Sequence, residues 1–163
     1  MGEYMSDFHV EIVERPEIVT AGVKVATTME KCGVDCPALW EKNFGPRMAD
    51  FPADPRYPNQ SFGVSVMIDQ SAFDYWAVMP LREGAAIPTG MEKLVLAGGS
   101  YAECRLNGLA ELGDAYNYVY LKWAAAQEKF VLNMAEASIE LYTSEFMTTG
   151  KLVIYCPLAA KQS

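Results

Sequence analysis

The fold is decided by residues 109–123, LAELGDAYNYVYLKW, together with the later segment 138–143, SIELYT. In the first segment, apolar and aromatic residues recur every three or four positions, which predicts an amphipathic helix that buries one face. In the second, apolar residues alternate with Glu140 and Tyr142, which predicts a strand. A helix followed by such a strand is typical of a helix packed on an antiparallel sheet.

The segments around this helix complete a unit that spans about residues 91–158. Two strands precede the helix, at 93–96 and 101–106, and Ala97-Gly98-Gly99-Ser100 between them predicts a hairpin turn. Two more strands follow the helix, at 139–143 and 152–156, and Pro157 is expected to end the last one.

The first half of the chain, about residues 8–81, has the same order of elements. A helix is expected where Asp35 can cap it and Pro37 suits its first turn, with Gly45-Pro46 as the interruption. A loop rich in proline follows at 49–60, and Pro80 ends the last strand. The four strands are predicted at residues 10–14, 19–27, 62–68 and 73–79.

This duplication predicts an α+β fold in which each strand-strand-helix-strand-strand unit forms an antiparallel sheet with a helix packed on it. We expect one domain over residues 1–163, with a pseudo-two-fold groove where the repeats meet. Ligand sites often form at such junctions.

Composition excludes several classes of protein. A net charge of −8 opposes binding to nucleic-acid phosphates, whereas it favours cations. The longest apolar runs, such as 152–160, are shorter than the roughly 20 residues of a membrane-spanning helix, and the acidic N-terminus is unlike a secretory signal. We therefore expect a cytoplasmic protein that binds neither membranes nor DNA.

No metal or cofactor is expected. Cys32 and Cys36 have the separation of two metal ligands, but no second cysteine pair follows and His9 is the only histidine. We interpret the four cysteines, which include Cys104 and Cys156, as reduced and mainly as small buried side chains.

The main candidate for a functional residue is Glu140. Alternation along the strand puts Ile139 and Leu141 on one face, expected to meet the helix, and Glu140 and Tyr142 on the other. Glu140 then points either into solvent, as most glutamates do, or into the groove.

When the two repeats are aligned, Gly63 is equivalent to Glu140 and Ser65 is equivalent to Tyr142. Small residues on one side of the groove would leave space for a ligand beside the carboxylate. Only one of Tyr75 and Trp76 can face the groove, and the sequence leaves that choice open. The predicted ligand-binding residues are Glu140, Tyr142, Trp123, Tyr75, Trp76, Tyr116, Phe62, Gly63, Ser65 and Met67.

The helix ending near Trp123 and the later Glu140 two residues before Tyr142 resemble the signature of the GyrI-like effector-binding family. The resemblance implies a multidrug-type pocket in which Glu140 meets the positive charge of a lipophilic ligand and aromatic residues stack on it. Some relatives are joined to a helix-turn-helix domain, some interact with DNA gyrase, and some resemble hydrolases of reactive cyclopropane toxins.

Three functions follow as hypotheses. The first is a binding module that senses or sequesters lipophilic cations used as toxins or drugs, without turnover. The second is a hydrolase in which Glu140 acts as general base and Tyr142 donates to the leaving group. The third is an inhibitor of DNA gyrase that binds through its acidic surface. The ligand, any protein partner and the oligomeric state do not follow from the sequence.

Overall fold

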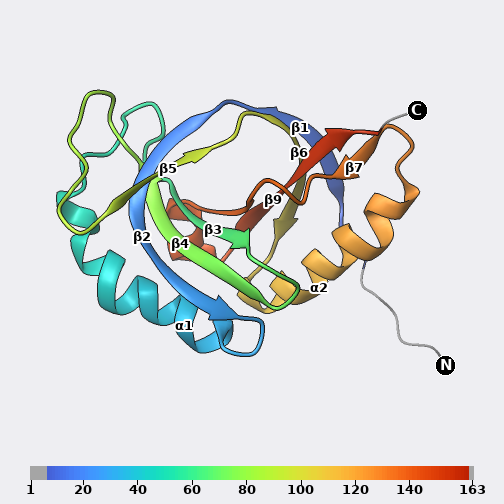
Figure 1. The fold of residues 1–163 in the computed structure, drawn as a ribbon, viewed down its shortest axis with the longest axis horizontal. Helices are drawn as coiled ribbons and strands as arrows, with labels where there is room; N and C mark the ends of the chain where they lie inside the picture. The colour runs from blue at the N-terminus through green and yellow to red at the C-terminus, as the bar shows by residue number, and fades with distance from the viewer. Residues whose placement is uncertain (1–6, 162–163) are drawn as a thin grey trace. The chain divides into compact units, whose positions relative to one another are not determined.

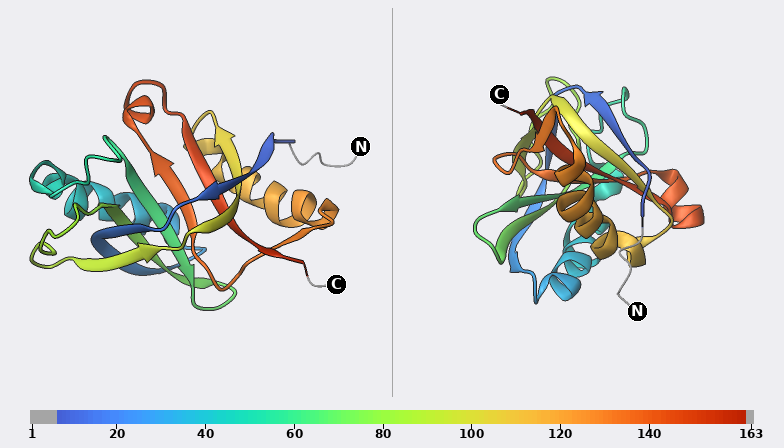
Figure 2. Two further views of the ribbon diagram at one scale, coloured as in Figure 1. Left: turned by 90° about the horizontal axis from the view of Figure 1, so that it is seen from above. Right: turned by 90° about the vertical axis from the view of Figure 1, so that its right-hand side faces the viewer.

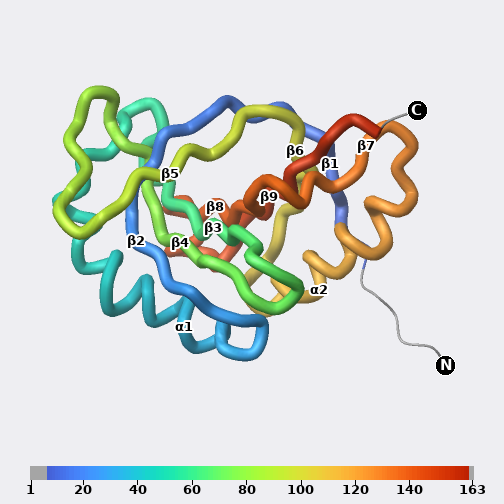
Figure 3. Tube along the Cα trace, viewed as in Figure 1, coloured from blue at the N-terminus to red at the C-terminus, as the bar shows by residue number. Residues whose placement is uncertain are grey.

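The structure is a computed structural model that describes residues 7–161. Two compact units form it: a middle unit, Glu17–Ala97, and a terminal unit made by the chain up to Pro16 and from Gly98 onward. The chain therefore crosses between units twice, and Figure 3 follows its trace through both crossings.

The middle unit is a four-stranded antiparallel sheet with the strand order β3-β4-β2-β5. Its helical segment connects β2 to β3 and lies along β2 and β4 (Figure 1). The strands are β2 (Ile18–Thr28), β3 (Ser61–Met67), β4 (Ala72–Pro80) and β5 (Glu92–Leu96).

The terminal unit is also antiparallel, with the order β1-β6-β9-β8 and with β7 paired to β9. Its helical segment connects β6 to β7 and packs beside the strands, as the side views in Figure 2 show. The strands are β1 (Val10–Arg15), β6 (Gly99–Leu106), β7 (Phe130–Leu132), β8 (Ser138–Tyr142) and β9 (Leu152–Ala160).

The two strand orders are equivalent, which confirms the duplicated α+β fold. In the middle unit β4 lies between β3 and β2, and in the terminal unit β9 lies between β8 and β6. In both units this central strand is the last one of its repeat, and its neighbours come from before and after the helix. The fourth strand of each sheet comes from the other half of the sequence, since β1 pairs with β6 and β5 pairs with β2.

The hairpin predicted across residues 97–100 is therefore wrong. β5 and β6 do not pair with each other: β5 pairs with β2 in the middle unit, and β6 pairs with β1 in the terminal unit. This exchange brings Ile18 opposite Leu96, where both side chains are buried. Likewise, strands 10–14 and 19–27 both exist but do not pair with each other.

The first helix differs from its prediction at both ends. It begins at Cys32, and Asp35 lies in its first turn instead of capping it. Gly45-Pro46 does not end it, because the chain continues as a 3₁₀ helix. A side chain at Gly45 would collide with the Trp40 carbonyl oxygen, only 2.5 Å away. The segment consists of α1 (Cys32–Ala38), the π-helical η1 (Leu39–Phe44) and the 3₁₀ helix η2 (Gly45–Asp50).

The second helix begins at Leu109 as predicted, and it continues three residues past Trp123 as a 3₁₀ helix. Its winding changes along its length, from 3₁₀ to α to π and back to 3₁₀. The parts are η3 (Leu109–Glu111), α2 (Leu112–Asn117), η4 (Tyr118–Trp123) and η5 (Ala124–Ala126).

Pro157 lies inside β9 and does not end it. Its carbonyl accepts a 2.8 Å hydrogen bond from the Asn133 amide. A residue of an antiparallel strand directs its N–H and C=O to the same side. On that side β8 pairs with residues 153–155 and β7 with residues 158–160, so Pro157 lies between the two ladders and its missing N–H interrupts neither.

Within residues 7–161, no helix combines the length and apolarity that crossing a membrane requires. Each unit has its own apolar core between helix and sheet. The middle core is centred on Phe44, Ala77, Tyr75 and Phe73, and the terminal core on Val119, Ile154, Cys104 and Cys156.

Candidate functional site

Glu140 lies at the centre of β8 and is only 7% exposed. It pairs with Ile154, whose side chain belongs to the core beneath the second helix. Cross-strand partners share a face of the sheet, so Glu140 also points toward that helix. The prediction that Ile139 and Leu141 would meet the helix is therefore wrong, and the glutamate occupies the helix-facing position.

The carboxylate can be buried under the helix because phenol groups donate hydrogen bonds to it. Tyr116 of α2 donates a 3.4 Å hydrogen bond to Oε2 of Glu140. Tyr142 donates a 2.7 Å hydrogen bond to Oε1 from two positions along the same strand. Hydrogen bonds to a charged acceptor are stronger than neutral ones, which offsets part of the cost of burying the carboxylate.

Aromatic rings extend this polar centre along the helix. The rings of Tyr116 and Tyr120 stack at 6.0 Å with an angle of 17° between their planes. Burial, and then the charge of Glu140, raise the pKa of Tyr116 well above 10. Burial also raises the pKa of Tyr120, although a hydrogen bond with Ser138 opposes part of the shift in both residues. Both phenols are therefore protonated donors at neutral pH.

Strand β8 leads directly into a short helix that covers Tyr142. The Phe146 ring meets the Tyr142 ring edge-on at 4.8 Å. This helix, α3 (Ser144–Thr149), begins where the Thr143 hydroxyl accepts a hydrogen bond from the Glu145 amide, and it ends at Gly150 in the left-handed region. Neither α3 nor Phe146 was predicted from the sequence, although a capping threonine and a terminal glycine could have indicated the helix.

Trp123 lies two turns beyond Tyr116, on the π-helical part of the segment. It is half-buried and packs against the terminal core, and its carbonyl accepts a hydrogen bond from the Gln127 side chain. The structure thus places Glu140, Tyr142, Tyr116 and Trp123 in one unit, and it adds Tyr120, Ser138 and Phe146 to their surroundings.

The other predicted residues belong to the middle unit, where Tyr75 and Trp76 lie on opposite faces of β4. Tyr75 faces the first helix, and its hydroxyl accepts a 2.9 Å hydrogen bond from Nε1 of Trp40. Trp76 lies on the opposite face, where the Lys24 ammonium is 5.1 Å from its ring centre.

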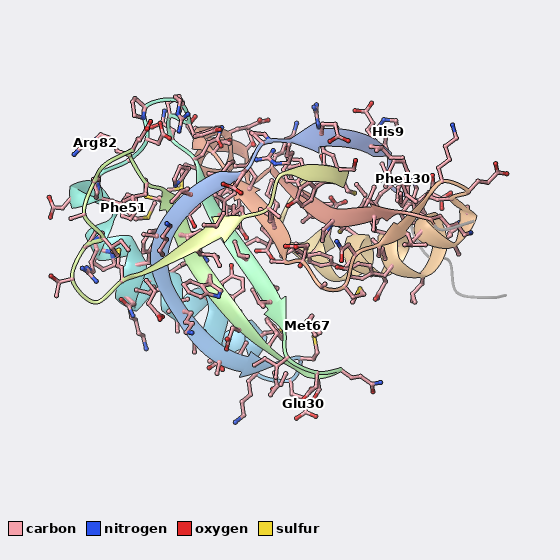
Figure 4. The ribbon with its side chains drawn as sticks, turned by 45° about the horizontal axis from the view of Figure 1, so that its top comes forward. His9, Glu30, Phe51, Met67, Arg82 and Phe130 are labelled. Atoms are coloured by element: carbon pink, nitrogen blue, oxygen red, sulfur yellow. The ribbon has the colours of Figure 1, made fainter. Side chains whose placement is uncertain are left out.

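The remaining predicted residues divide between the same two faces. Gly63, Ser65 and Met67 pair with Ala77, Tyr75 and Phe73, so they share the helix-facing side. Phe62 pairs with Val78 and shares the face of Trp76. Met67, labelled in Figure 4, is the last residue of β3. Its side chain is 37% exposed. Gly63 thus faces the first helix as Glu140 faces the second.

The duplicated antiparallel α+β fold, with a helix packed on the strands of each unit, is that of an effector-binding domain of the GyrI-like class. More narrowly, the chain belongs to the family of integron-associated effector binding proteins (Cass2), whose family model matches residues 11–158. The chain is therefore a small-molecule-binding domain.

Solved structures with a similar fold include that of SAV2435 bound to tetraphenylphosphonium, with a TM-score of 0.74 and 12% identity over 93% of this chain and 94% of that one. An integron cassette protein of Vibrio cholerae has a TM-score of 0.61 and 16% identity, covering 92% and 95% of the two chains. At these identities the likeness concerns the fold.

A similar sequence is the transcriptional regulator BrlR of Pseudomonas aeruginosa, which is 26% identical over 141 residues. The match covers 86% of this chain and 50% of BrlR. The chain thus spans about half the length of this curated relative.

Proposed function

We propose that the chain binds lipophilic aromatic cations, with Glu140 as the anionic group that meets the positive charge, and that it senses or sequesters toxins or drugs of this type. The observation that carries the proposal is the carboxylate of Glu140, buried among phenols that donate to both of its oxygens.

Phenol donors carry no charge, so these two hydrogen bonds stabilise an ionised carboxylate without neutralising it. A cation 4 Å away gains about 4 kcal/mol at an effective dielectric constant of 20, before the desolvation of both charges is subtracted. Hydrogen bonds at fixed positions also orient the carboxylate in advance, which reduces the entropy lost on binding.

The surrounding rings favour aromatic and delocalised cations over small hydrated ones. Tyr142 and Phe146 meet edge to face, and Tyr116 stacks on Tyr120. A cation over such a ring gains about 0.5–2 kcal/mol from cation–π attraction. These terms are largely insensitive to ligand shape, so the expected specificity is broad and the affinity moderate.

The comparisons support this ligand class without defining it for this chain. The family is one of effector binding proteins, and the similar SAV2435 structure holds tetraphenylphosphonium, a lipophilic aromatic cation. The contributions of Tyr75, Trp76, Phe62, Gly63, Ser65 and Met67 to a ligand site stay predictions, as do cytoplasmic location and the absence of direct DNA binding.

The test is calorimetric titration with tetraphenylphosphonium, paired with neutral triphenylphosphine oxide. Glu140→Gln should weaken binding of the cation at least tenfold and leave binding of the neutral compound within about twofold, since about 1.4 kcal/mol corresponds to a factor of ten. Glu145→Gln, at an exposed position on α3, is the matched control and should change neither. Equal affinities of wild type and Glu140→Gln for the cation would refute the anchor.

The hydrolase hypothesis requires Tyr142 to donate its proton to a leaving group, whereas that hydroxyl donates to Glu140 in this structure. Turnover of a reactive electrophile, lost in Glu140→Gln, would establish catalysis. Recovery of a gyrase subunit with the tagged protein would establish the gyrase hypothesis.

A further inference from the structure

A pair of cysteines lies outside the Glu140 site, at the start of the first helix. Cys32 and Cys36 are separated by one helical turn in α1, and neither forms a disulfide. Residues four apart on a helix lie on the same side, with Cβ atoms about 5–6 Å apart. Both side chains are half-buried and pack against the edge of the middle core, so their thiols are held on one side and are still accessible.

We infer that Cys32 and Cys36 form a dithiol site for soft, thiophilic centres that take two thiolates, and that trivalent aryl arsenicals are the ligand class it fits. The site is in the middle unit, so it is independent of the function proposed for Glu140.

The reaction needs no oxidant or reductant. An aryl arsenous acid carries two hydroxyl groups on As(III), and each thiol replaces one of them. Two As–S bonds form, two As–O bonds break, and the two thiol protons leave with the hydroxyl groups as two water molecules. Arsenic stays trivalent, and rotation about the side-chain bonds of two cysteines one turn apart brings both sulfur atoms to one arsenic atom.

The helix adds an aromatic surface for the aryl ring. Trp40 is one further turn along the same side of the segment and packs against the same core. Its indole N–H is fixed by the 2.9 Å hydrogen bond to Tyr75, and its ring meets Phe44 edge-on at 5.7 Å. A fixed ring beside the pair favours an aryl arsenical over inorganic arsenite.

The local structure holds the Cys32 thiol and the first turn of α1 in place. The Cys32 Sγ donates a 3.4 Å hydrogen bond to the Met29 carbonyl in the turn before α1, a turn marked in Figure 4 by Glu30. The Thr27 hydroxyl donates to the Asp35 carboxylate at 2.9 Å, which ties the first helical turn to β2. The helix is thus positioned before any ligand arrives.

The other two cysteines differ in both location and chemistry. Cys104 and Cys156 are fully buried in the terminal core. Burial raises the pKa of Cys104 to about 11 and that of Cys156 to about 12, which suppresses the reactive thiolate. A folded chain should therefore capture an arsenical only at Cys32 and Cys36.

The experiment uses phenylarsine oxide, with the adduct followed by intact mass, thiol counting and tryptophan fluorescence, to which Trp40 contributes. Wild type should form a one-to-one adduct that masks two thiols. Cys32→Ser and Cys36→Ser should each weaken capture at least tenfold, because a second attachment within one molecule is favoured by its high effective concentration. Cys36→Ala repeats the test with another side chain, and circular dichroism checks the fold of each variant.

The matched control is the double variant Val34→Cys, Cys36→Ser. Val34 is 75% exposed, so the change preserves the thiol count without disturbing the core. Positions two apart on a helix do not face each other, so this variant should capture as weakly as the single ones. Glu140→Gln should capture as wild type does, whatever its effect on cation binding. Any of three results would overturn the inference. The first is a wild type that stays unmodified, and the second is undiminished capture by either single variant or by the control. The third is an adduct on Cys104 or Cys156.

Discussion

The hydroxyl of Tyr142 donates a 2.7 Å hydrogen bond to Oε1 of Glu140, two residues before it on the same strand. Side chains two apart on a strand point to the same face, so strand geometry places the Tyr142 hydroxyl on the same face as the Glu140 carboxylate. Tyr116 approaches the other oxygen from the helix. The carboxylate is thus oriented by one local and one tertiary contact.

Glu140→Ala should destabilise the protein, whereas Glu140→Gln should not do so strongly. The alanine leaves two half-buried phenol donors without this acceptor, which costs about 1–3 kcal/mol. Glutamine keeps an amide oxygen and removes a buried charge, so its free energy of unfolding should stay within about 1 kcal/mol of wild type. Urea denaturation measures both, and equal midpoints for wild type and Glu140→Ala would contradict the network.

The protein should lose stability as the pH rises above about 9. Burial raises the folded-state pKa values of Cys104, Cys156, Tyr116 and Tyr120 above the ordinary 9.0 and 10.0 of these side chains. The unfolded chain therefore releases these protons first, and their contribution to stability is present below pH 9 and declines above it.

Urea midpoints between pH 8 and pH 11 test this decline, and absorbance at 295 nm follows tyrosine ionisation. Cys156→Ala should show a shallower decline than wild type, because one group with a raised pKa is removed. A midpoint that stays constant to pH 11 would show that these groups titrate alike in the folded and unfolded chain.

Gly22→Ala should be strongly destabilising. A Cβ at this position of β2 would lie 1.9 Å from the Ala77 carbonyl oxygen on β4, so the backbones must separate. We expect a loss of about 1–3 kcal/mol from such overpacking. Gly33→Ala is the control, because its Cβ meets nothing within 4 Å and α1 should gain about 0.5–1 kcal/mol. Thermal unfolding should give Gly22→Ala a lower melting temperature than Gly33→Ala. Similar melting temperatures for the two variants would contradict the prediction.

Thr27→Val should loosen the start of the first helix. The valine has a similar shape but cannot donate to the Asp35 carboxylate, which should cost about 0.5–1.5 kcal/mol. Amide hydrogen exchange should become faster in α1 than in β4, and Asp35→Asn, which keeps an acceptor oxygen, should have the smaller effect. Unchanged exchange in α1 would show that the hydroxyl does not hold the helix.

Short-range regularities predicted much of this molecule. The three- and four-residue spacing of Leu112, Tyr116 and Val119 identified the second helix, which begins at Leu109 as expected. The repeated order of elements identified the duplicated fold, because each copy has an apolar face to bury. The capping of α1 by Asp35 was predicted wrongly, since its carboxylate binds Thr27, which lies outside the helix.

By itself, the sequence determined that Glu140 and Tyr142 share a face, because strand geometry fixes the direction of alternate side chains. Only the tertiary structure decided that this face meets the helix, since the choice depends on whether distant groups such as Tyr116 satisfy the carboxylate. It also decided that β1 joins the terminal unit and β5 the middle unit, and that Tyr75, not Trp76, faces the first helix. These outcomes depend on pairings far apart in the chain, which no local pattern distinguishes from their alternatives.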